Sequence, residues 1–301
     1  MTRGALFGIG VSTAVTEAET TIGHVAEADR LGLDLFTVSD HPYFADRLDA
    51  YSIVGFALGA TSRISGLVSV TNLPSRPAPM LARSVSSLSA LSGGRVVLGM
   101  GAGGLWDDIA RLGVEKLTPG AAVAAFEEAV TLIRALTGGG RPVTFDGEHY
   151  RVTDLEPSPA PTPPIWTGSV GPKSLAATGR VADGWIPGHA ADWLSSRYHQ
   201  SRPVIDAAAV AAGRVPGDIA TVYNMPGEIT AKPRARTRGD DGRWIGGSAG
   251  QWAEELTGAV VEHGAAGFVY FPAGATPPGT ALARWAGEVV PAVREALSAQ
   301  K

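Results

Sequence analysis

An aspartate and a histidine stand side by side directly after a short apolar run of the sequence. Residues 34–38 have the composition of a buried strand, and Asp40-His41 follow them in the stretch LFTVSDHPY. A histidine can accept or donate a proton near neutral pH. A neighbouring carboxylate can orient the imidazole and support its protonated form, provided that the two side chains meet. The pair is therefore a candidate for general acid–base chemistry, and the alternative is an ordinary turn.

Other familiar catalytic motifs are missing from the sequence. There is no cysteine, which excludes thiolate nucleophiles, disulfides and cysteine-based metal sites. The histidines lack the H-x-H and H-E-x-x-H spacings, so no metal site is expected. No G-x-S-x-G elbow or Walker motif occurs. The glycines of GMGAGG, residues 99–104, match G-x-G-x-x-G, but no acidic residue ends a second strand about twenty residues later. We interpret these glycines as a tight turn or as a close backbone approach to a flat ring.

The composition is that of a compact enzyme rather than a disordered or fibrous chain. The 301 residues are 45% hydrophobic and 18% charged. The net charge of -4 makes nucleic acid an unexpected partner. No apolar run reaches the roughly 18 residues that span a bilayer, and the first residues lack a signal-peptide pattern. We therefore expect a cytoplasmic protein that acts on a small molecule, without membrane contact.

Short apolar runs alternate with longer amphipathic stretches along the chain. Eight strand–helix units with continuously apolar strands fit a closed (β/α)8 TIM barrel, and an open doubly wound sheet is the alternative. We expect one α/β domain over residues 1–301. Thr16 and Glu19 have capping-box spacing at the first predicted helix, which Gly32 ends. The predicted strands are residues 5–11, 34–38, 64–70, 95–101, 164–168, 183–187, 219–225 and 267–271, and later helices are 77–92, 119–137, 190–212, 249–263 and 279–299.

Two segments interrupt this alternation. Residues 143–152 alternate with period two around Asp146-Gly147, which predicts a small hairpin. Residues 227–248, after the seventh strand, are polar and rich in glycine. Loops after barrel strands lie on the catalytic face, so this second segment is either a lid or a solvated linker.

Polar or glycine-rich stretches follow the second, third, fourth and fifth strands. The carboxyl ends of parallel barrel strands meet at one face, so these stretches should surround one pocket. Backbone N–H groups of Gly168-Ser-Val-Gly-Pro172 lie where a helix begins, a position that can hold an anion. The alternative for this last stretch is an ordinary Gly-Pro turn.

Three stretches of the chain resemble the luciferase-like monooxygenase superfamily in the same order. They are LARSVSSLSALSGGRVVLGMGAGGLWDDIARLG (81–113), GEHYRV (147–152) and PIWTGSVGPKSLAATGRVADGWIPG (164–188). The resemblance runs from about residue 5 to residue 271. It implies a (β/α)8 barrel that binds a flavin-type cofactor and is commonly a homodimer. The chain looks most like the branch that uses the deazaflavin coenzyme F420, whereas other branches use FMN.

The resemblance also implies roles for individual residues. Asp40 and His41 match an Asp-His pair that ends the second strand in F420 enzymes, and His41 would move the substrate proton. Ser69 and Val70 match a bulge, often with a non-prolyl cis peptide, that presses against the cofactor ring. The loop Gly168, Ser169, Val170 and Gly171 matches cofactor-contacting residues after the fifth strand.

Two departures from the family pattern concern the substrate. Asp107 falls where the sugar-phosphate branch has an asparagine that contacts the cofactor, so it remains a candidate cofactor ligand. Gly104 falls where that branch has an acidic residue. Both departures argue against a sugar phosphate. Trp106 either lines the substrate pocket or packs in the core.

Three functions follow from these features. The first is an F420-dependent oxidoreductase that transfers a hydride between the deazaflavin and a small organic substrate. The second is an FMN-dependent monooxygenase that uses reduced flavin and oxygen. The third is a barrel that binds a flavin or another ligand without catalysis.

Overall fold

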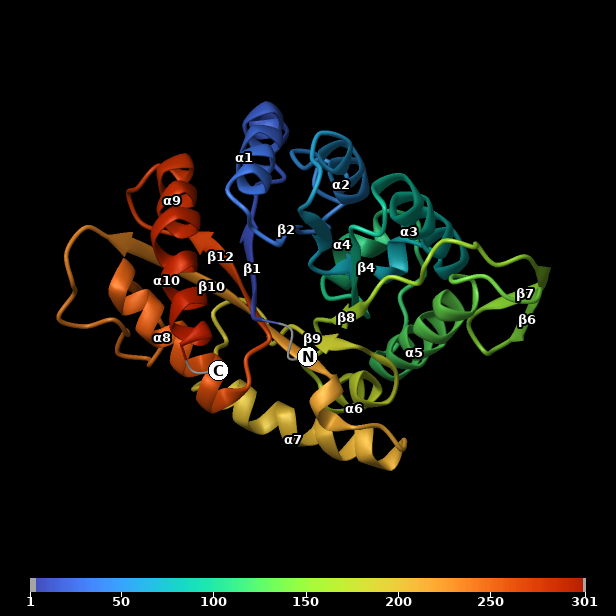
Figure 1. Cartoon of the computed structure of the whole chain (residues 1–301). Helices are drawn as coiled ribbons and strands as arrows, with labels where there is room; N and C mark the ends of the chain where they lie inside the picture. Colours follow the sequence, from blue (N-terminus) through green and yellow to red (C-terminus); the bar gives the residue numbers. More distant parts are fainter. Residues whose placement is uncertain (1–3, 300–301) are drawn as a thin grey trace.

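A closed ring of eight parallel strands forms the centre of the molecule (Figure 1). The computed structural model describes residues 4–299. Each strand pairs in parallel with the next, and β10 pairs with both β9 and β12, which closes the ring. The predicted barrel is thus confirmed and the open sheet is excluded. The strands are β1 (Leu6–Gly10), β2 (Leu35–Val38), β3 (Ser65–Val68), β5 (Val96–Gly101), β8 (Ile165–Thr167), β9 (Gly184–Trp185), β10 (Ala220–Thr230) and β12 (Gly267–Pro272).

Helices surround this ring. They are α1 (Ala18–Arg30), α2 (Ala50–Gly59), α3 (Ala78–Ser92), α5 (Pro119–Ala135), α6 (Pro172–Val181), α7 (Ser196–Ala211), α8 (Ala249–His263), α9 (Pro278–Arg284) and α10 (Val290–Ser298). A π-helical segment, Trp285–Val289, joins the last two, so the predicted helix 279–299 contains an irregular middle. The predicted capping box at Thr16 is wrong. A 3-10 turn, Val15–Glu17, precedes α1 and places Thr16 inside a turn rather than at a helix boundary.

The barrel interior is packed in its middle and hollow at its carboxyl end. Alternate residues of a strand point to the same side. The inward-facing layer nearer the carboxyl ends therefore lies two residues beyond the packed layer on each strand. In that next layer β3 is followed by Ser69, β8 by Gly168 and β9 by Gly188, which are all small. Small side chains leave room for a cavity at this end. The packed layer consists of Leu35, Leu67, Trp166, Ile186, Val222 and Val269.

The predicted hairpin is confirmed. Strands β6 (Val143–Asp146) and β7 (Arg151–Leu155) are antiparallel, and Asp146 pairs with Arg151. The Glu128 carboxylate of α5 accepts backbone N–H groups of Glu148 at 2.8 Å and His149 at 2.9 Å. These bonds hold the hairpin turn against the helix layer.

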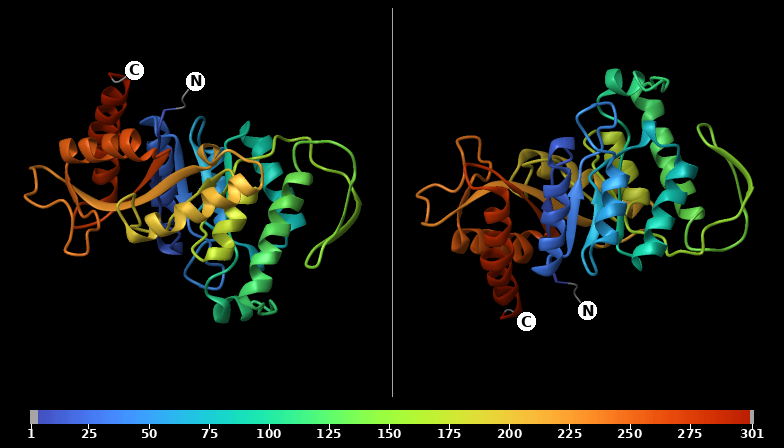
Figure 2. Two further views of the ribbon diagram at one scale, coloured as in Figure 1. Left: turned by 90° about the horizontal axis from the view of Figure 1, so that it is seen from below. Right: turned by 90° about the horizontal axis from the view of Figure 1, so that it is seen from above.

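The polar segment after the seventh strand is partly a continuation of the sheet. Strand β10 runs to Thr230, and β11 (Gly246–Ser248) pairs with it, so only residues 231–245 leave the barrel. We call residues 231–245 the excursion. The excursion and the β6–β7 hairpin lie at opposite ends of the molecule (Figure 2).

Among residues 4–299, no helix has both the length and the apolar character needed to cross a membrane. In the same range, no three histidine or acidic side chains come together as metal ligands would.

Candidate active site

A cavity of about 350 Å³ lies at the carboxyl ends of β2, β3, β5 and β8. The stretches after these four strands meet there, as the sequence predicts. Among residues 4–299, no lysine or arginine lines the cavity. The lining residues are Ser39, Asp40, His41, Tyr43, Ser69, Val70, Thr71, Asn72, Gly101, Ala102, Gly103, Gly104, Leu105, Gly168 and Val170. The excursion contributes none of them, so in this structure it is not a lid over the cavity.

His41 is half-buried in the wall of this cavity. Its Nδ1 atom lies 2.7 Å from the Tyr43 hydroxyl oxygen, within hydrogen-bond distance. Its ring also packs near Phe44, with ring centres 5.8 Å apart. The other ring nitrogen, Nε2, has no hydrogen-bond partner within residues 4–299.

The condition that the Asp40 and His41 side chains meet is not fulfilled in this structure, because Arg76 holds the carboxylate. Arg76 donates from Nε at 2.9 Å and from Nη2 at 2.7 Å to the two Asp40 oxygens. The Asn72 backbone N–H adds a third bond at 2.9 Å. The Asp40 side chain is fully buried, and a buried carboxylate is stable only when it is paired. Asp40 therefore fixes the segment after β3 rather than the imidazole.

Arg76 also binds a second acid. Its Nη2 lies 2.5 Å from Asp49 Oδ2, and Asp49 caps α2 by accepting the Ser52 N–H at 2.8 Å. The guanidinium stands 4.8 Å from the centre of the Tyr51 ring. Burial lowers the pKa of Arg76, but its bonds to the two acids outweigh burial and raise the pKa overall. We call Asp40, Asp49, Tyr51 and Arg76 the Arg76 cluster.

The segment after β3 forms one wall of the cavity. The Ser69–Val70 peptide is cis and both residues line the cavity, which confirms the predicted backbone geometry. The chain then continues as β4 (Thr71–Asn72), which pairs with β5. A Cβ atom on Gly101 would lie 2.7 Å from the Val70 side chain, and one on Gly168 would lie 3.1 Å from it. Both positions are glycine because Val70 occupies the space.

The loop after β8 splits into a lining part and a supporting part. Gly168 and Val170 line the cavity. The buried Ser169 hydroxyl accepts a bond from Thr178 at 2.9 Å, and its carbonyl accepts the Trp185 indole N–H at 2.9 Å. Gly171 precedes the first turn of α6 as its N-cap. Ser169 and Gly171 thus support the loop from behind, and neither lines the cavity.

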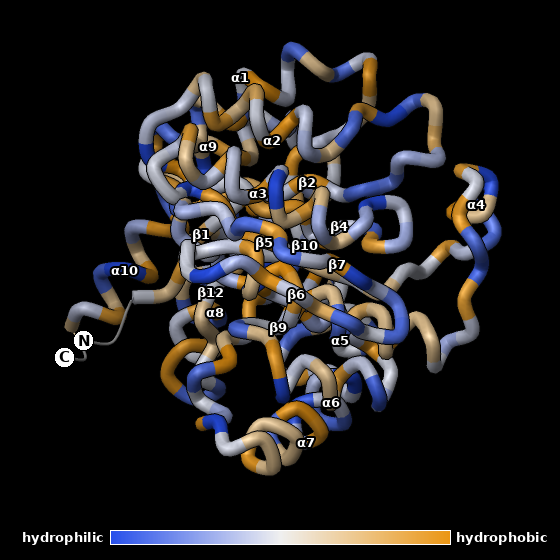
Figure 3. The backbone as a smooth tube through the Cα atoms, turned by 90° about the vertical axis from the view of Figure 1, so that its right-hand side faces the viewer, coloured by the Kyte–Doolittle hydropathy of each residue, from blue (hydrophilic) through white to orange (hydrophobic). Residues whose placement is uncertain are grey.

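Asp107 and Trp106 do not line the cavity either. They begin α4 (Trp106–Ala110), which lies apart from the barrel (Figure 3). The Asp107 side chain is 94% exposed and forms an ion pair with Lys116 at 2.6 Å. Trp106 instead packs beside Gly103, where a Cβ atom would lie 3.1 Å from the indole. The predicted cofactor contact of Asp107 therefore has no support, because the glycine turn directs α4 away from the strand ends.

Sequence reasoning missed three residues of this site. Tyr43 contacts His41, Arg76 holds Asp40, and Asn72 lines the cavity with a buried side-chain oxygen that has no partner within residues 4–299. The sequence alone could have indicated Arg76, because it is the only charged residue of the stretch 69–79 that follows the third strand.

Comparisons with known proteins agree with this geometry. The family model described as luciferase-like monooxygenase matches residues 4–239. The phthiodiolone/phenolphthiodiolone dimycocerosates ketoreductase of Mycobacterium tuberculosis (strain ATCC 25618 / H37Rv) is 32% identical over 238 residues, covering 70% of this chain and 61% of that protein. The F420-dependent glucose-6-phosphate dehydrogenase of Microbacterium testaceum (strain StLB037) is 32% identical over 207 residues, covering 66% and 60%. The chain thus spans about three fifths of the length of these relatives.

Solved structures show the same fold at lower identity. The coenzyme F420-dependent tetrahydromethanopterin reductase from Methanopyrus kandleri superposes with a TM-score of 0.79 at 17% identity, covering 96% of this chain and 99% of that one. An F420-dependent secondary alcohol dehydrogenase, in complex with an F420-acetone adduct, superposes with a TM-score of 0.79 at 18% identity, covering 97% and 100%. With the family match over most of its length, the chain belongs to the luciferase-like monooxygenase family.

Proposed function

We propose that this protein is an oxidoreductase that uses coenzyme F420 and a small, uncharged carbinol or carbonyl compound, with His41 moving the substrate proton. The observation that carries the proposal is the His41 imidazole in a cavity that is also walled by Ser69 and Val70. Relatives and structural neighbours named as F420-dependent support the choice of cofactor.

The cavity residues fit a flat ring. Glycines and the compact Val70 side chain leave its wall smooth, and the unpartnered Asn72 Oδ1 atom can accept an N–H of a bound ring. Ser69, Val70, Gly168 and Val170 would hold the cofactor. When bound, the deazaflavin supplies a carbon atom that accepts or gives a hydride. Asp107 is left out of this set because its side chain is exposed and does not line the cavity.

The charges around the cavity indicate an uncharged substrate. No lysine or arginine of the described part of the chain lines it, and the Asp40 charge is already neutralised by Arg76. A phosphate group entering this space would lose its hydration without meeting a cation, which is unfavourable. A neutral alcohol or ketone meets no such cost. This agrees with the two departures from the sugar-phosphate pattern at Gly104 and Asp107.

His41 would take the proton that an alcohol loses when it becomes a carbonyl compound, and would return it in the reverse reaction. The free Nε2 atom is the site of that exchange. We expect His41→Ala to leave F420 affinity unchanged, because backbone groups after β3 and β8 hold the ring. The single-turnover rate of hydride transfer should fall roughly 10² to 10⁴-fold, the usual contribution of a positioned acid or base.

The experiment titrates F420 and FMN separately and then follows F420 absorbance with a panel of secondary alcohols. His189→Ala is the matched control, because His189 is an exposed histidine at the same end of the barrel that does not line the cavity. Unchanged hydride transfer in His41→Ala would refute the role of His41. Tighter binding of FMN together with oxygen consumption would favour the monooxygenase, and ligand binding without either reaction would favour a non-catalytic barrel.

We also propose a cytoplasmic homodimer. Phe56 on α2 and Leu91 on α3 are 71% and 86% exposed, and large exposed apolar side chains on adjacent helices are typical of interfaces. Light scattering at several concentrations measures the molar mass and would contradict the dimer if it gave that of one chain.

A further inference from the structure

The partner of His41 is a hydroxyl group rather than a carboxylate. Tyr43 Oη lies 2.7 Å from His41 Nδ1, and Tyr43 lines the same cavity. The Tyr43 ring packs edge-on against Phe44, with ring centres 4.8 Å apart, so its position is fixed by packing as well. The neighbouring carboxylate, Asp40, does not hydrogen-bond to His41, because both of its oxygens accept hydrogen bonds from Arg76.

A hydroxyl and a carboxylate constrain an imidazole differently. An ionised carboxylate only accepts hydrogen bonds, so it holds Nδ1 in the protonated form. A phenol hydroxyl can donate or accept. If Nδ1 carries the proton, it donates to Tyr43 Oη. If Nε2 carries the proton, the Tyr43 O–H donates to Nδ1. The contact therefore survives in each tautomer and in the imidazolium.

Tyr43 remains a phenol at neutral pH in this environment. Burial raises the pKa of Tyr43, the Asp108 and Asp40 carboxylates raise it further, and the Asn72 side chain lowers it in part. Asp40 after β2, Asn72 on β4 and Asp108 on α4 are thus the charged and polar groups that influence Tyr43, and Arg76 pairs with Asp40.

We propose that Tyr43 is the positioning residue for His41, and that its hydroxyl orients the imidazole in both protonation states. This inference rests on the proposed function. A bound deazaflavin would supply the acceptor for the C–H hydride of an alcohol, and as the C=O bond forms the O–H proton would pass to His41 Nε2. The imidazolium then donates from Nδ1 to Tyr43 Oη. In the reduction of a ketone, each of these transfers is reversed and the Nδ1 contact is kept.

The test combines Tyr43→Phe with His41→Ala. Tyr43→Phe keeps the ring that packs on Phe44 and removes only the hydroxyl. We expect unchanged F420 affinity and a roughly 10 to 100-fold slower single-turnover hydride transfer, the usual effect of losing a partner that orients a functional histidine. The loss should be similar for alcohol oxidation and for ketone reduction. In the His41→Ala background, Tyr43→Phe should not slow hydride transfer further, because the hydroxyl acts on the rate through the imidazole.

Tyr150→Phe is the matched control, since Tyr150 lies in the distant hairpin turn. Nitrogen NMR of histidine-labelled protein supplies a readout without turnover: the His41 Nδ1 signal should shift in Tyr43→Phe and not in the control. Equal losses of rate in the wild-type and His41→Ala backgrounds would overturn the inference, as would an unshifted Nδ1 signal. If the wild type transfers no hydride, the proposed function fails, and the NMR measurement still decides whether Tyr43 holds His41.

Discussion

Two arginines, on different sides of the barrel, each bridge two acids. Arg76 joins Asp40 and Asp49 beside the cavity. Arg238, in the excursion, binds Asp192 at 2.6 Å and also pairs with Glu255 of α8. The Arg238 guanidinium lies 6.0 Å from the Trp193 ring and 5.8 Å from the Trp244 ring. We call Asp192, Trp193, Arg238, Trp244 and Glu255 the Arg238 cluster.

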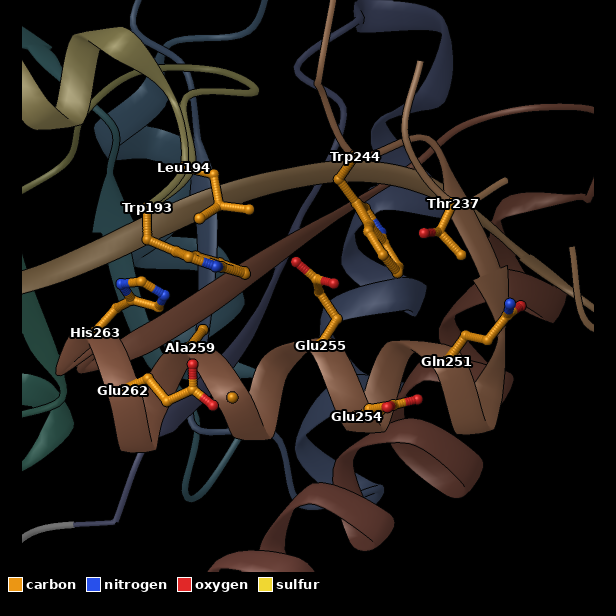
Figure 4. A pocket seen from close by; sticks show the side chains of 11 residues that line it. Trp193, Leu194, Thr237, Trp244, Gln251, Glu254, Glu255, Ala259, Glu262 and His263 are labelled. Carbon is orange, nitrogen blue, oxygen red and sulfur yellow. The ribbon is translucent and has the colours of Figure 1, made fainter. Parts of the chain in front are cut away.

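The two clusters have the same chemistry and different surroundings. In the Arg76 cluster the bridged Asp40 is fully buried and lines the candidate active site. The Arg238 cluster fastens the excursion to α8, and Glu255 faces a second cavity between the indoles and that helix (Figure 4). Each cluster has one buried acid, Asp40 or Asp192, and one partly exposed acid, Asp49 or Glu255. The difference that concerns function is the backbone that each cluster holds: the Arg76 cluster anchors a wall of the candidate active site, whereas the excursion does not line it.

The largest effect should come from Arg76→Met. This change leaves the buried Asp40 carboxylate without a counter-charge, which costs about 3 kcal/mol or more. We expect a lower urea midpoint of unfolding and weaker F420 binding, because the segment after β3 loses its anchor. Adding Asp40→Asn to Arg76→Met should recover part of the stability, since the uncompensated charge is gone. Equal destabilisation by Arg76→Met and Arg238→Met would break the distinction between the clusters.

A smaller effect is expected from Arg238→Met. Arg238 donates one hydrogen bond to the buried Asp192, whereas Arg76 donates two to Asp40, so the loss should be about 1–2 kcal/mol. Thermolysin, which does not require arginine, should cleave the excursion faster in the variant. Hydride transfer should equal that of the wild type, because the excursion does not line the active-site cavity. A slower hydride transfer would show that the excursion acts on the active site.

The smallest effect is expected for the contribution of Asp49 to the free energy of unfolding, which should fall at acidic pH. Burial raises the pKa of Asp49, but hydrogen bonds from Arg76 and the Ser52 N–H outweigh it, and the folded-state pKa is lowered. The stabilisation is therefore present above the unfolded pKa of about 3.9 and is lost as pH falls through the folded value. Because the Asp49 side chain is 43% exposed, the difference from Asp49→Asn should be only about 0.5 kcal/mol.

Urea unfolding of the wild type and Asp49→Asn at pH 6 and pH 3 measures this difference, which should shrink at pH 3. Asp46→Asn is the control, because Asp46 is a nearby exposed acid. A difference between wild type and Asp49→Asn that grows on acidification would contradict the assigned sign.

The sequence predicts the frame of the site better than its side-chain contacts. Strand–helix alternation and the small residues after the strands gave the barrel and the position of the cavity. The sequence does not reveal the pairing of Asp40, because its partner, Arg76, lies 36 positions further along the chain and meets it only in the folded barrel. Helix α2 was missed because its residues are nearly all apolar, which removes the amphipathic period.

The shortest strand of the ring, β9, links the barrel's integrity to the cavity. Only Gly184 and Trp185 join β8 to β10, and the same Trp185 indole holds the Ser169 carbonyl of the loop after β8. A local opening of this seam would release Gly168 and Val170, so a molecule bound to them must oppose the opening. By thermodynamic linkage, a molecule that binds the cavity more tightly also makes the local opening at β9 rarer. The amide protons of β9 are then better protected against exchange with solvent. Hydrogen exchange at two residues can thus report occupancy of the cavity, whatever molecule fills it.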